Sequence, residues 1–142
     1  MQLSNAGLNV LKEYEALRLT PYLCSSGTWT NGWGHTKGVT ANTPRITNEE
    51  AEQNLRDDVA EFENAVDEYV LVDLRQNQFD ALVCFAFNIG IRAFKTSTLV
   101  KKLNQRDYLG AVMEFQRWSL VDNVRSNGLL RRRFKTASLF LE

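Results

Sequence analysis

Apolar side chains recur at three- and four-residue steps along several stretches of the chain, which is the pattern of amphipathic helices. The longest stretch follows a capping box in which Thr47 is the cap and Glu50 reaches back to it. Its apolar positions are Ala51, Leu55, Val59, Phe62, Val66 and Tyr69. The pattern predicts one helix over about residues 48–70, longer than the average helix of ~11–12 residues.

Other segments carry the same helical pattern over shorter lengths. Ser4 is a suitable N-cap for a first helix, which would hold Glu15 in its last turn. Asp73 with Gln76 predicts the start of a strongly apolar helix that closes at Asn88-Ile89-Gly90. Further helices are predicted from Thr96 to Leu103, from Asp107 to Trp118 and, after a loop over Asn123 to Gly128, from about Leu129 to Leu141.

One stretch near the N-terminus has strand character instead. Two β-prone runs flank the small turn residues Ser25-Ser26-Gly27, and the second run carries Thr28, Trp29, Thr30 and Trp33. This pattern predicts a hairpin with a three- to five-residue loop. We find no internal repeat and no linker, so residues 1–142 are interpreted as one α+β domain, mostly helical with one small sheet.

Composition adds little to the fold but limits the chemistry. The chain has 142 residues, 44% hydrophobic and 24% charged, as in an ordinary globular domain. Its formal net charge is zero, yet residues 1–71 carry five Lys/Arg against eleven Asp/Glu, and residues 72–142 carry twelve against six. This asymmetry indicates either orientation on a polyanion or simply solvated helix faces. Neither a signal peptide, a membrane anchor nor a zinc-type Cys/His spacing is recognised.

The predicted hairpin would bring three chemically useful side chains together. Glu15 precedes it, Cys24 ends its first strand and Thr30 lies on its second. A carboxylic acid, a second polar group and a hydroxyl around one cleft suit acid-assisted hydrolysis.

The spacing of these three residues resembles the catalytic Glu–(Asp or Cys)–Thr set of phage-type lysozymes, the endolysins of glycoside hydrolase family 24. Eight residues separate Glu15 from Cys24, and five separate Cys24 from Thr30. Segments that also fit are Glu15-x-x-Arg18-Leu19-x-x-Tyr22, Thr30-x-Gly32-x-Gly34-His35, Asn77-Gln78-Phe79-Asp80-Ala81-Leu82, Phe87-Asn88-Ile89-Gly90 and Leu130-Arg131-Arg132-Arg133. The resemblance covers nearly the whole chain in the right order.

The resemblance implies a lysozyme-like fold and a wall-degrading activity. An N-terminal hairpin lobe (about 1–48) and a C-terminal helical lobe (about 71–142) would be joined by the helix at about 48–70. The implied reaction is hydrolysis of the β-1,4 bond between N-acetylmuramic acid and N-acetylglucosamine in bacterial peptidoglycan, with no metal or other cofactor. A monomer that waits in the host cytoplasm, without stable membrane insertion, is expected.

It also implies roles for particular residues. Glu15 would be the general acid, and Thr30 would position the attacking water. Cys24 would orient water, act as a thiolate base or only fill space, because an unperturbed thiol of pKa ~8.5 is mostly neutral at pH 7. Asn88 and Trp118 would contact substrate, although ending a helix and core packing are their alternatives.

The remaining implied roles are supporting ones. His35 is expected to pair with Asp58 rather than to catalyse, and Arg18 could oppose Glu15. One of Arg131, Arg132 and Arg133 would approach the catalytic glutamate, but which one is left open. Trp29 and Trp33 could stack on sugars or pack in the core, and Cys84, on an apolar stripe, is expected to pack.

Two positions depart from the family pattern. Ala16 replaces a glycine and Asn31 replaces an aliphatic residue, which needs a partner if it faces the core. Together with Cys24 they support an alternative, a wall-binding lysozyme-like module without turnover. Nucleic-acid binding through Arg131–Arg133 is disfavoured, because one short basic run in a neutral protein is weak support.

Overall fold

The computed structural model describes residues 1–121 and 124–142 and is mostly helical, with short antiparallel strand pairs. The predicted α+β class is confirmed. The chain divides into two compact units, one of residues Met1–Leu8 with Glu61–Glu142 and the other of residues Asn9–Ala60. The first eight residues therefore belong with the C-terminal part of the sequence.

The predicted hairpin is present in the unit of residues 9–60. Strand β1 (Arg18–Leu23) pairs antiparallel with β2 (Trp29–Gly32), with Tyr22 opposite Thr30 and Leu23 opposite Trp29. Residues 24–28 form the loop, which is closed by a 3.0 Å hydrogen bond from Cys24 N to Thr28 O.

The second strand is shorter than predicted, because Thr28 and Trp33 lie outside it. Gly32 (φ 55°) and Gly34 (φ 78°) take left-handed backbone conformations, which glycine tolerates best. They form a tight turn that returns His35 to Asn31, with backbone hydrogen bonds of 2.9 and 2.8 Å between the two residues.

Helix α1 (Asn5–Glu13) begins as predicted, since Ser4 Oγ accepts a 3.2 Å hydrogen bond from Gly7 N. The prediction that Glu15 lies in its last turn is wrong. The helix ends at Glu13, and Glu15 follows in a tighter turn in which its N–H donates to Lys12 O at 3.3 Å. Such a hydrogen bond, from a backbone N–H to the carbonyl oxygen three residues earlier, is common at the C-terminal end of a helix.

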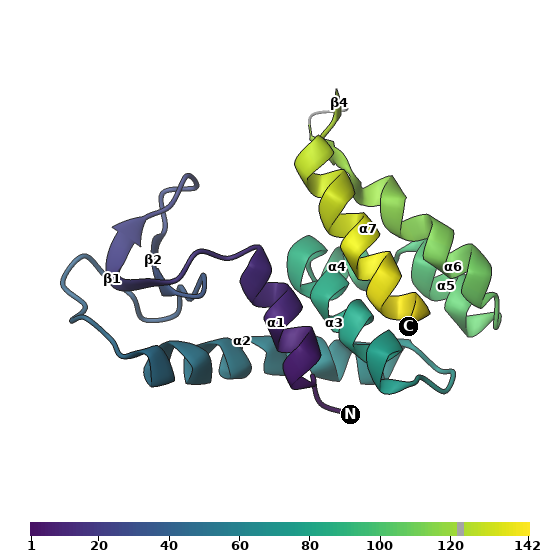
Figure 1. Ribbon diagram of the computed structural model, residues 1–142, viewed down its shortest axis with the longest axis horizontal. Coiled ribbons are helices and arrows are strands. Elements are labelled where there is room, and N and C mark those ends of the chain that lie inside the picture. Colours follow the sequence, from purple (N-terminus) through teal and green to yellow (C-terminus); the bar gives the residue numbers. More distant parts are fainter. Residues whose placement is uncertain (122–123) are drawn as a thin grey trace. The chain divides into compact units, whose positions relative to one another are not determined.

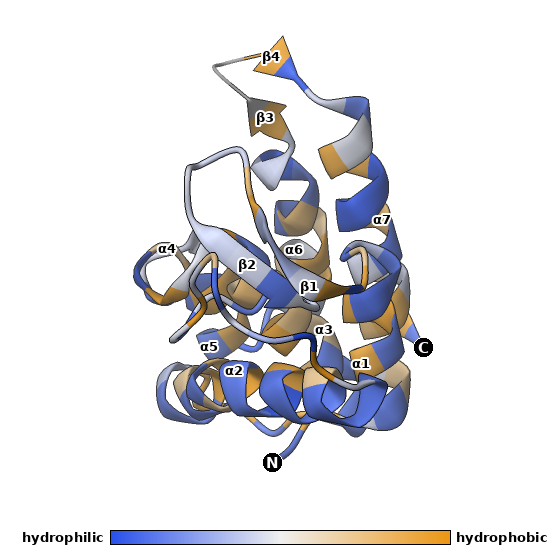
Figure 2. Ribbon diagram, turned by 90° about the vertical axis from the view of Figure 1, so that its left-hand side faces the viewer, coloured by the Kyte–Doolittle hydropathy of each residue, from blue (hydrophilic) through white to orange (hydrophobic). Residues whose placement is uncertain are grey.

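Helix α2 (Asn48–Tyr69) confirms the predicted capping box, with Glu50 N donating to Thr47 Oγ1 at 3.1 Å and Thr47 N to Glu50 Oε1 at 3.2 Å. Leu55, Val59 and Val66 of the predicted stripe are buried. In Figure 2 hydrophilic residues predominate along α2, with hydrophobic ones recurring at intervals. The helix belongs to both units, which divide between Ala60 and Glu61.

Helix α3 (Gln76–Ile89) is the centre of the larger unit, and every residue from Gln78 to Ala86 is buried. Helix α7 (Asn127–Leu141) packs along it, as Figure 1 shows. Around these lie α4 (Ile91–Lys95), α5 (Thr98–Asn104), α6 (Tyr108–Glu114) and the 3-10 helix η1 (Phe115–Trp118). Phe85 makes edge-to-face contacts with Phe94, Phe115 and Trp118 at centroid distances of 6.3, 5.1 and 5.9 Å.

Some predicted boundaries in this unit are wrong. Arg75, rather than Asp73, occupies the N-cap position of α3, although Gly90 (φ 92°) closes the helix as predicted. The last helix begins at Asn127 because Ser126 Oγ accepts from Leu129 N. The predicted loop contains strand β4 (Val124–Arg125), which pairs with β3 (Leu120–Val121), while Asn123 lies outside the described residues.

The first eight residues are held by carboxylates of the same unit. Asp80, which is buried on α3, accepts from Ser4 N at 3.0 Å and also from Ser4 Oγ. Glu63 accepts from Leu3 N, and Gln76 Nε2 donates to Gln2 O at 2.8 Å. These bonds join the start of the chain to α2 and α3.

Candidate active site

Glu15 is half-buried and lies against the turn that follows β2. A Cβ atom added at Gly34 would be 3.0 Å from Glu15 Oε2 and 3.4 Å from its carboxyl carbon. Together with the positive φ of Gly34, this close approach explains why glycine is needed at that position. The turn after β2 is therefore fitted to the Glu15 carboxyl group.

Cys24 is the first residue of the hairpin loop. It therefore lies near the start of β2, whereas Glu15 packs against the turn that follows the end of β2. Its Sγ is 2.9 Å from Ser26 Oγ. Hydrogen bonding by the Ser26 hydroxyl, then by the Thr28 and Ser26 backbone amides and the Thr30 hydroxyl, lowers the pKa of Cys24 to about 6. Hydrogen bonds to a thiolate favour the charged form, so this side chain is largely ionised at neutral pH. The sequence alone left its charge open.

Thr30 is buried, with 4% of its surface exposed, and its hydroxyl donates to Thr28 O at 3.0 Å. A hydroxyl has one hydrogen and two lone pairs. Thr30 can therefore give its hydrogen either to Thr28 O or to the Cys24 thiolate, but not to both at once. Its oxygen remains able to accept a hydrogen bond from a third group.

The structure places His35 beside Asp58, the partner expected from the sequence. His35 Nδ1 lies 2.8 Å from Asp58 Oδ2, and both side chains are mostly buried. This contact joins the turn after β2 to α2, which stabilises the turn against which Glu15 packs. Arg18 is exposed, and its guanidinium carbon lies 4.6 Å from the centre of the Tyr22 ring.

Asn88 and Trp118 are brought together in the larger unit by Arg133. Arg133 is 3% exposed; its Nη1 donates to Asn88 Oδ1 at 3.2 Å and its Nε to Trp118 O at 3.1 Å. Arg131 is exposed and Arg132 is intermediate. The sequence did not distinguish Arg133 from its two neighbours. Its spacing of three residues from Thr136 and seven from Phe140, both buried, would have placed it on the same buried face of the helix.

Trp29, Trp33 and Cys84 have environments that are common for surface or packed side chains, whereas that of Asn31 is unusual. Trp33 is half-buried beneath Lys12 Nζ, 5.4 Å from the ring centre, and Trp29 is 36% exposed. Cys84 is buried, as expected, and burial raises its pKa to about 12. The exception is Asn31, which is 2% exposed and whose Oδ1 has no hydrogen-bond partner among the described residues.

Within residues 1–121 and 124–142, no group of three or more His, Cys, Asp or Glu side chains could hold a metal ion. The same residues include no helix that is both long and apolar enough to cross a membrane.

A mostly helical protein in which an acidic residue packs against the turn that follows a short hairpin, and a thiol and a hydroxyl lie at the hairpin loop, has the features of a lysozyme-type glycoside hydrolase. The family model described as Phage lysozyme matches residues 12–136, and the chain belongs to this family. The predicted enzyme class, glycoside hydrolase, is thereby confirmed. Family membership implies peptidoglycan as the substrate.

Individual relatives agree with this assignment. The chain is 45% identical to an endolysin of Acyrthosiphon pisum secondary endosymbiont phage 1, over 99% of this chain and 98% of the relative. The muramidase domain of SpmX from Asticaccaulis excentricus has a similar structure, with a TM-score of 0.91 and 36% identity over 99% of this chain and 98% of that one. A point mutant of P22 lysozyme gives the same TM-score and identity, over 100% and 99%.

Proposed function

We propose that this protein hydrolyses the β-1,4 bond between N-acetylmuramic acid and N-acetylglucosamine in peptidoglycan, with Glu15 as the general acid. The observation that supports the proposal is the arrangement around the two ends of β2. The turn that follows β2 brings Gly34 against the Glu15 carboxyl group, and near the start of β2 Thr30 lies beside Cys24, whose pKa is lowered to about 6.

Glu15 would protonate the glycosidic oxygen as the bond to the leaving sugar breaks. Such proton donation requires a carboxyl group held in a fixed position relative to the substrate. The tight packing against Gly34 supports this role, because it restricts the carboxyl group to one side of the turn.

Cys24 would supply the negative charge that a carboxylate provides in relatives with Asp at this position. Because its pKa is lowered to about 6, the thiolate form predominates at pH 7. A negative charge near the anomeric carbon stabilises an oxocarbenium-like transition state. The thiolate could also accept a proton from the attacking water, which Thr30 Oγ1 would hold in place.

Direct attack by water, with inversion at the anomeric carbon, is the course that the family resemblance implies. Proton NMR of the newly formed reducing end, recorded before mutarotation, would show the α anomer if inversion occurs. The β anomer would instead indicate retention and a covalent intermediate.

Asn88 and Trp118 would contribute to substrate binding, the role that the family resemblance implies for them. Since Asn88 Oδ1 accepts from Arg133, the amide nitrogen of Asn88 is oriented as a donor. An N-acetyl carbonyl of the sugar is a suitable acceptor for it.

The test is the rate at which a peptidoglycan suspension clears with the wild-type chain, Glu15→Gln and Glu61→Gln at equal folded concentration. Glu61 is an exposed acid on α2 and serves as the matched control. We expect Glu15→Gln to abolish clearing and Glu61→Gln to leave it unchanged. No clearing by folded, wall-bound wild-type protein would instead identify the alternative, a binding module without turnover.

The cytoplasmic location before wall contact stays a prediction. Fractionation of expressing bacteria, with the inner membrane intact or permeabilised, would test it, and recovery in the membrane fraction would contradict it.

A further inference from the structure

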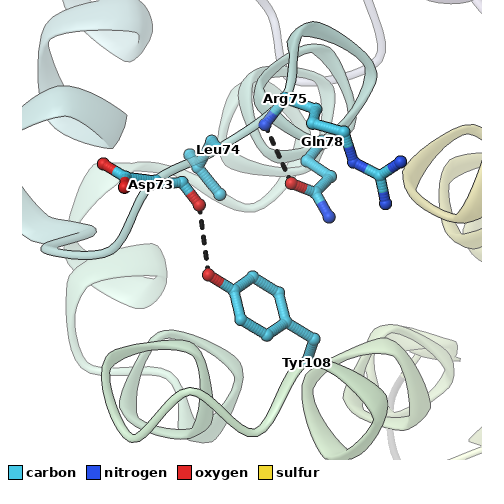
Figure 3. A pocket seen from close by; sticks show the side chains of 5 residues that line it. All are labelled: Asp73, Leu74, Arg75, Gln78 and Tyr108. Carbon is cyan, nitrogen blue, oxygen red and sulfur yellow. Dashed lines mark hydrogen bonds between the residues drawn. The ribbon is translucent and has the colours of Figure 1, made fainter.

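A cavity of about 400 Å³ lies at the start of α3 in the larger unit, and none of its lining residues is assigned to catalysis or sugar binding above. Asp73, Leu74, Arg75, Gln78 and Tyr108 line it, as Figure 3 shows. Small-molecule sites are usually ~300–1,000 Å³ in volume, so this cavity could hold a dipeptide-sized group.

Gln78 presents a hydrogen-bond donor to this cavity. The residue is 8% exposed, and its Oε1 accepts a 2.9 Å hydrogen bond from Arg75 N, which fixes the orientation of the side-chain amide. The amide nitrogen therefore points the other way, toward the space beside Tyr108 in Figure 3. Among the described residues, this nitrogen makes no hydrogen bond to a protein acceptor. Because Asn31 Oδ1 is the only buried side-chain nitrogen or oxygen atom without a partner among the described residues, the Gln78 nitrogen is open to solvent, and a ligand acceptor could take the place of water there.

The charges around the cavity favour an anion. Arg75 occupies the N-cap position of α3 and, unlike Ser or Asp, its side chain cannot accept from the first-turn amides. The positive end of the 14-residue helix dipole is thus not offset by a capping oxygen from that residue. The Arg75 guanidinium is exposed and adds a full positive charge.

The other lining residues do not oppose an anion. In Figure 3 the Asp73 carboxylate points away from Arg75 and Gln78, while its backbone oxygen accepts the Tyr108 hydroxyl hydrogen at 3.1 Å. The Tyr108 hydroxyl is therefore occupied, and the Tyr108 ring and Leu74 provide an apolar surface beside the donors.

We propose that this cavity binds the carboxylate end of a short acyl-peptide. Arg75 and Gln78 Nε2 donate to the carboxylate oxygens, and a small side chain of the peptide packs on Tyr108 and Leu74. One guanidinium and one amide suit a singly charged, planar group better than a phosphate dianion, which needs more positive charge. Since peptidoglycan carries peptides that end in carboxylates, the site would be a second contact with the wall, an interpretation that depends on the proposed function.

The binding test uses side-chain amide NMR of the full chain with three probes. These are N-acetyl-D-alanyl-D-alanine, the same dipeptide as its C-terminal amide, and inorganic phosphate. We expect the Gln78 side-chain signal to shift saturably with the free acid only. Arg75→Gln should weaken binding by about tenfold or more, since a hydrogen bond to a charged group is lost. Arg92→Gln, at an exposed arginine of α4, should leave the affinity unchanged.

Several results would overturn the proposal: no saturable shift, an equal response to the amide form, or unchanged affinity in Arg75→Gln. Saturation by phosphate at the same concentration would refute the assignment to a carboxylate. Glu15→Gln should bind the dipeptide normally, so failure of this inference and failure of the proposed catalytic role are distinguishable.

Discussion

The buried amide of Asn31 should make this protein less stable than its fold allows, and Asn31→Val should correct this. Asn31 is 2% exposed, and its Oδ1 has no partner among the described residues. Leaving a buried polar group unsatisfied costs about 1–3 kcal/mol. Valine removes that cost, is apolar and suits a strand position. We therefore expect the free energy of unfolding to rise by about 1–3 kcal/mol, and Tm by about 3–10 °C.

Urea unfolding followed by circular dichroism measures this change, with the m-value checked for constancy. Thr28→Val, at an exposed position of the same hairpin, is the matched control and should change stability by less than ~0.5 kcal/mol. If Asn31→Val is neutral or destabilising at constant m-value, the Asn31 oxygen is satisfied in solution and the reasoning is wrong.

Three further predictions concern the hairpin and the turn that follows it. Because the pKa of Cys24 is lowered to about 6, the rate of its alkylation by iodoacetamide should rise with pH around a midpoint near 6. Ser26→Ala should move that midpoint upward, since it removes the main hydrogen bond to sulfur. A wild-type midpoint near the ordinary thiol value of ~8.5 would contradict this prediction. If the thiolate supports catalysis, wall clearing should fall as pH drops below 6, because the thiol is then neutral. Gly34→Ala should lose roughly 1–2 kcal/mol of stability from its left-handed backbone and also 10–100-fold or so in activity from displacement of Glu15. Gly38→Ala, at φ 71° with open space around it, should lose similar stability but keep its activity; equal activities for the two variants would argue against a role for Gly34 in positioning Glu15.

Features that depend on neighbouring residues could be predicted from the sequence. The Thr47–Glu50 capping box, the hairpin loop and the glycine at the end of α3 each follow from a few adjacent side chains. The spacing of Glu15, Cys24 and Thr30 was also readable, because the hairpin register follows from loop length. These local rules were sufficient for the fold class, whereas the roles expected of the candidate catalytic residues came from the family resemblance.

Features that depend on distant contacts could not be predicted. The lowered pKa of Cys24 requires the loop geometry that directs Ser26 and the Thr28 amide at sulfur. The choice among three consecutive arginines depends on which face of α7 meets α3. The cap of α3 was misassigned because Gln78 reaches back to Arg75 N, which moves the helix start beyond Asp73.

The bonds from the first eight residues to α2 and α3 bear on how the chain folds as it is synthesised. The carboxylates that hold residues 1–8, Glu63 and Asp80, are added to the chain some sixty to eighty positions after those residues. The unit of residues 9–60 contains its own strand pair and can form earlier, since domains generally fold as units during synthesis. The core of the larger unit can form only after both α3 and α7 have been synthesised, because these two helices pack against each other. We therefore expect the unit that carries Glu15 to be complete on the growing chain before the unit that carries Asn88 and Trp118.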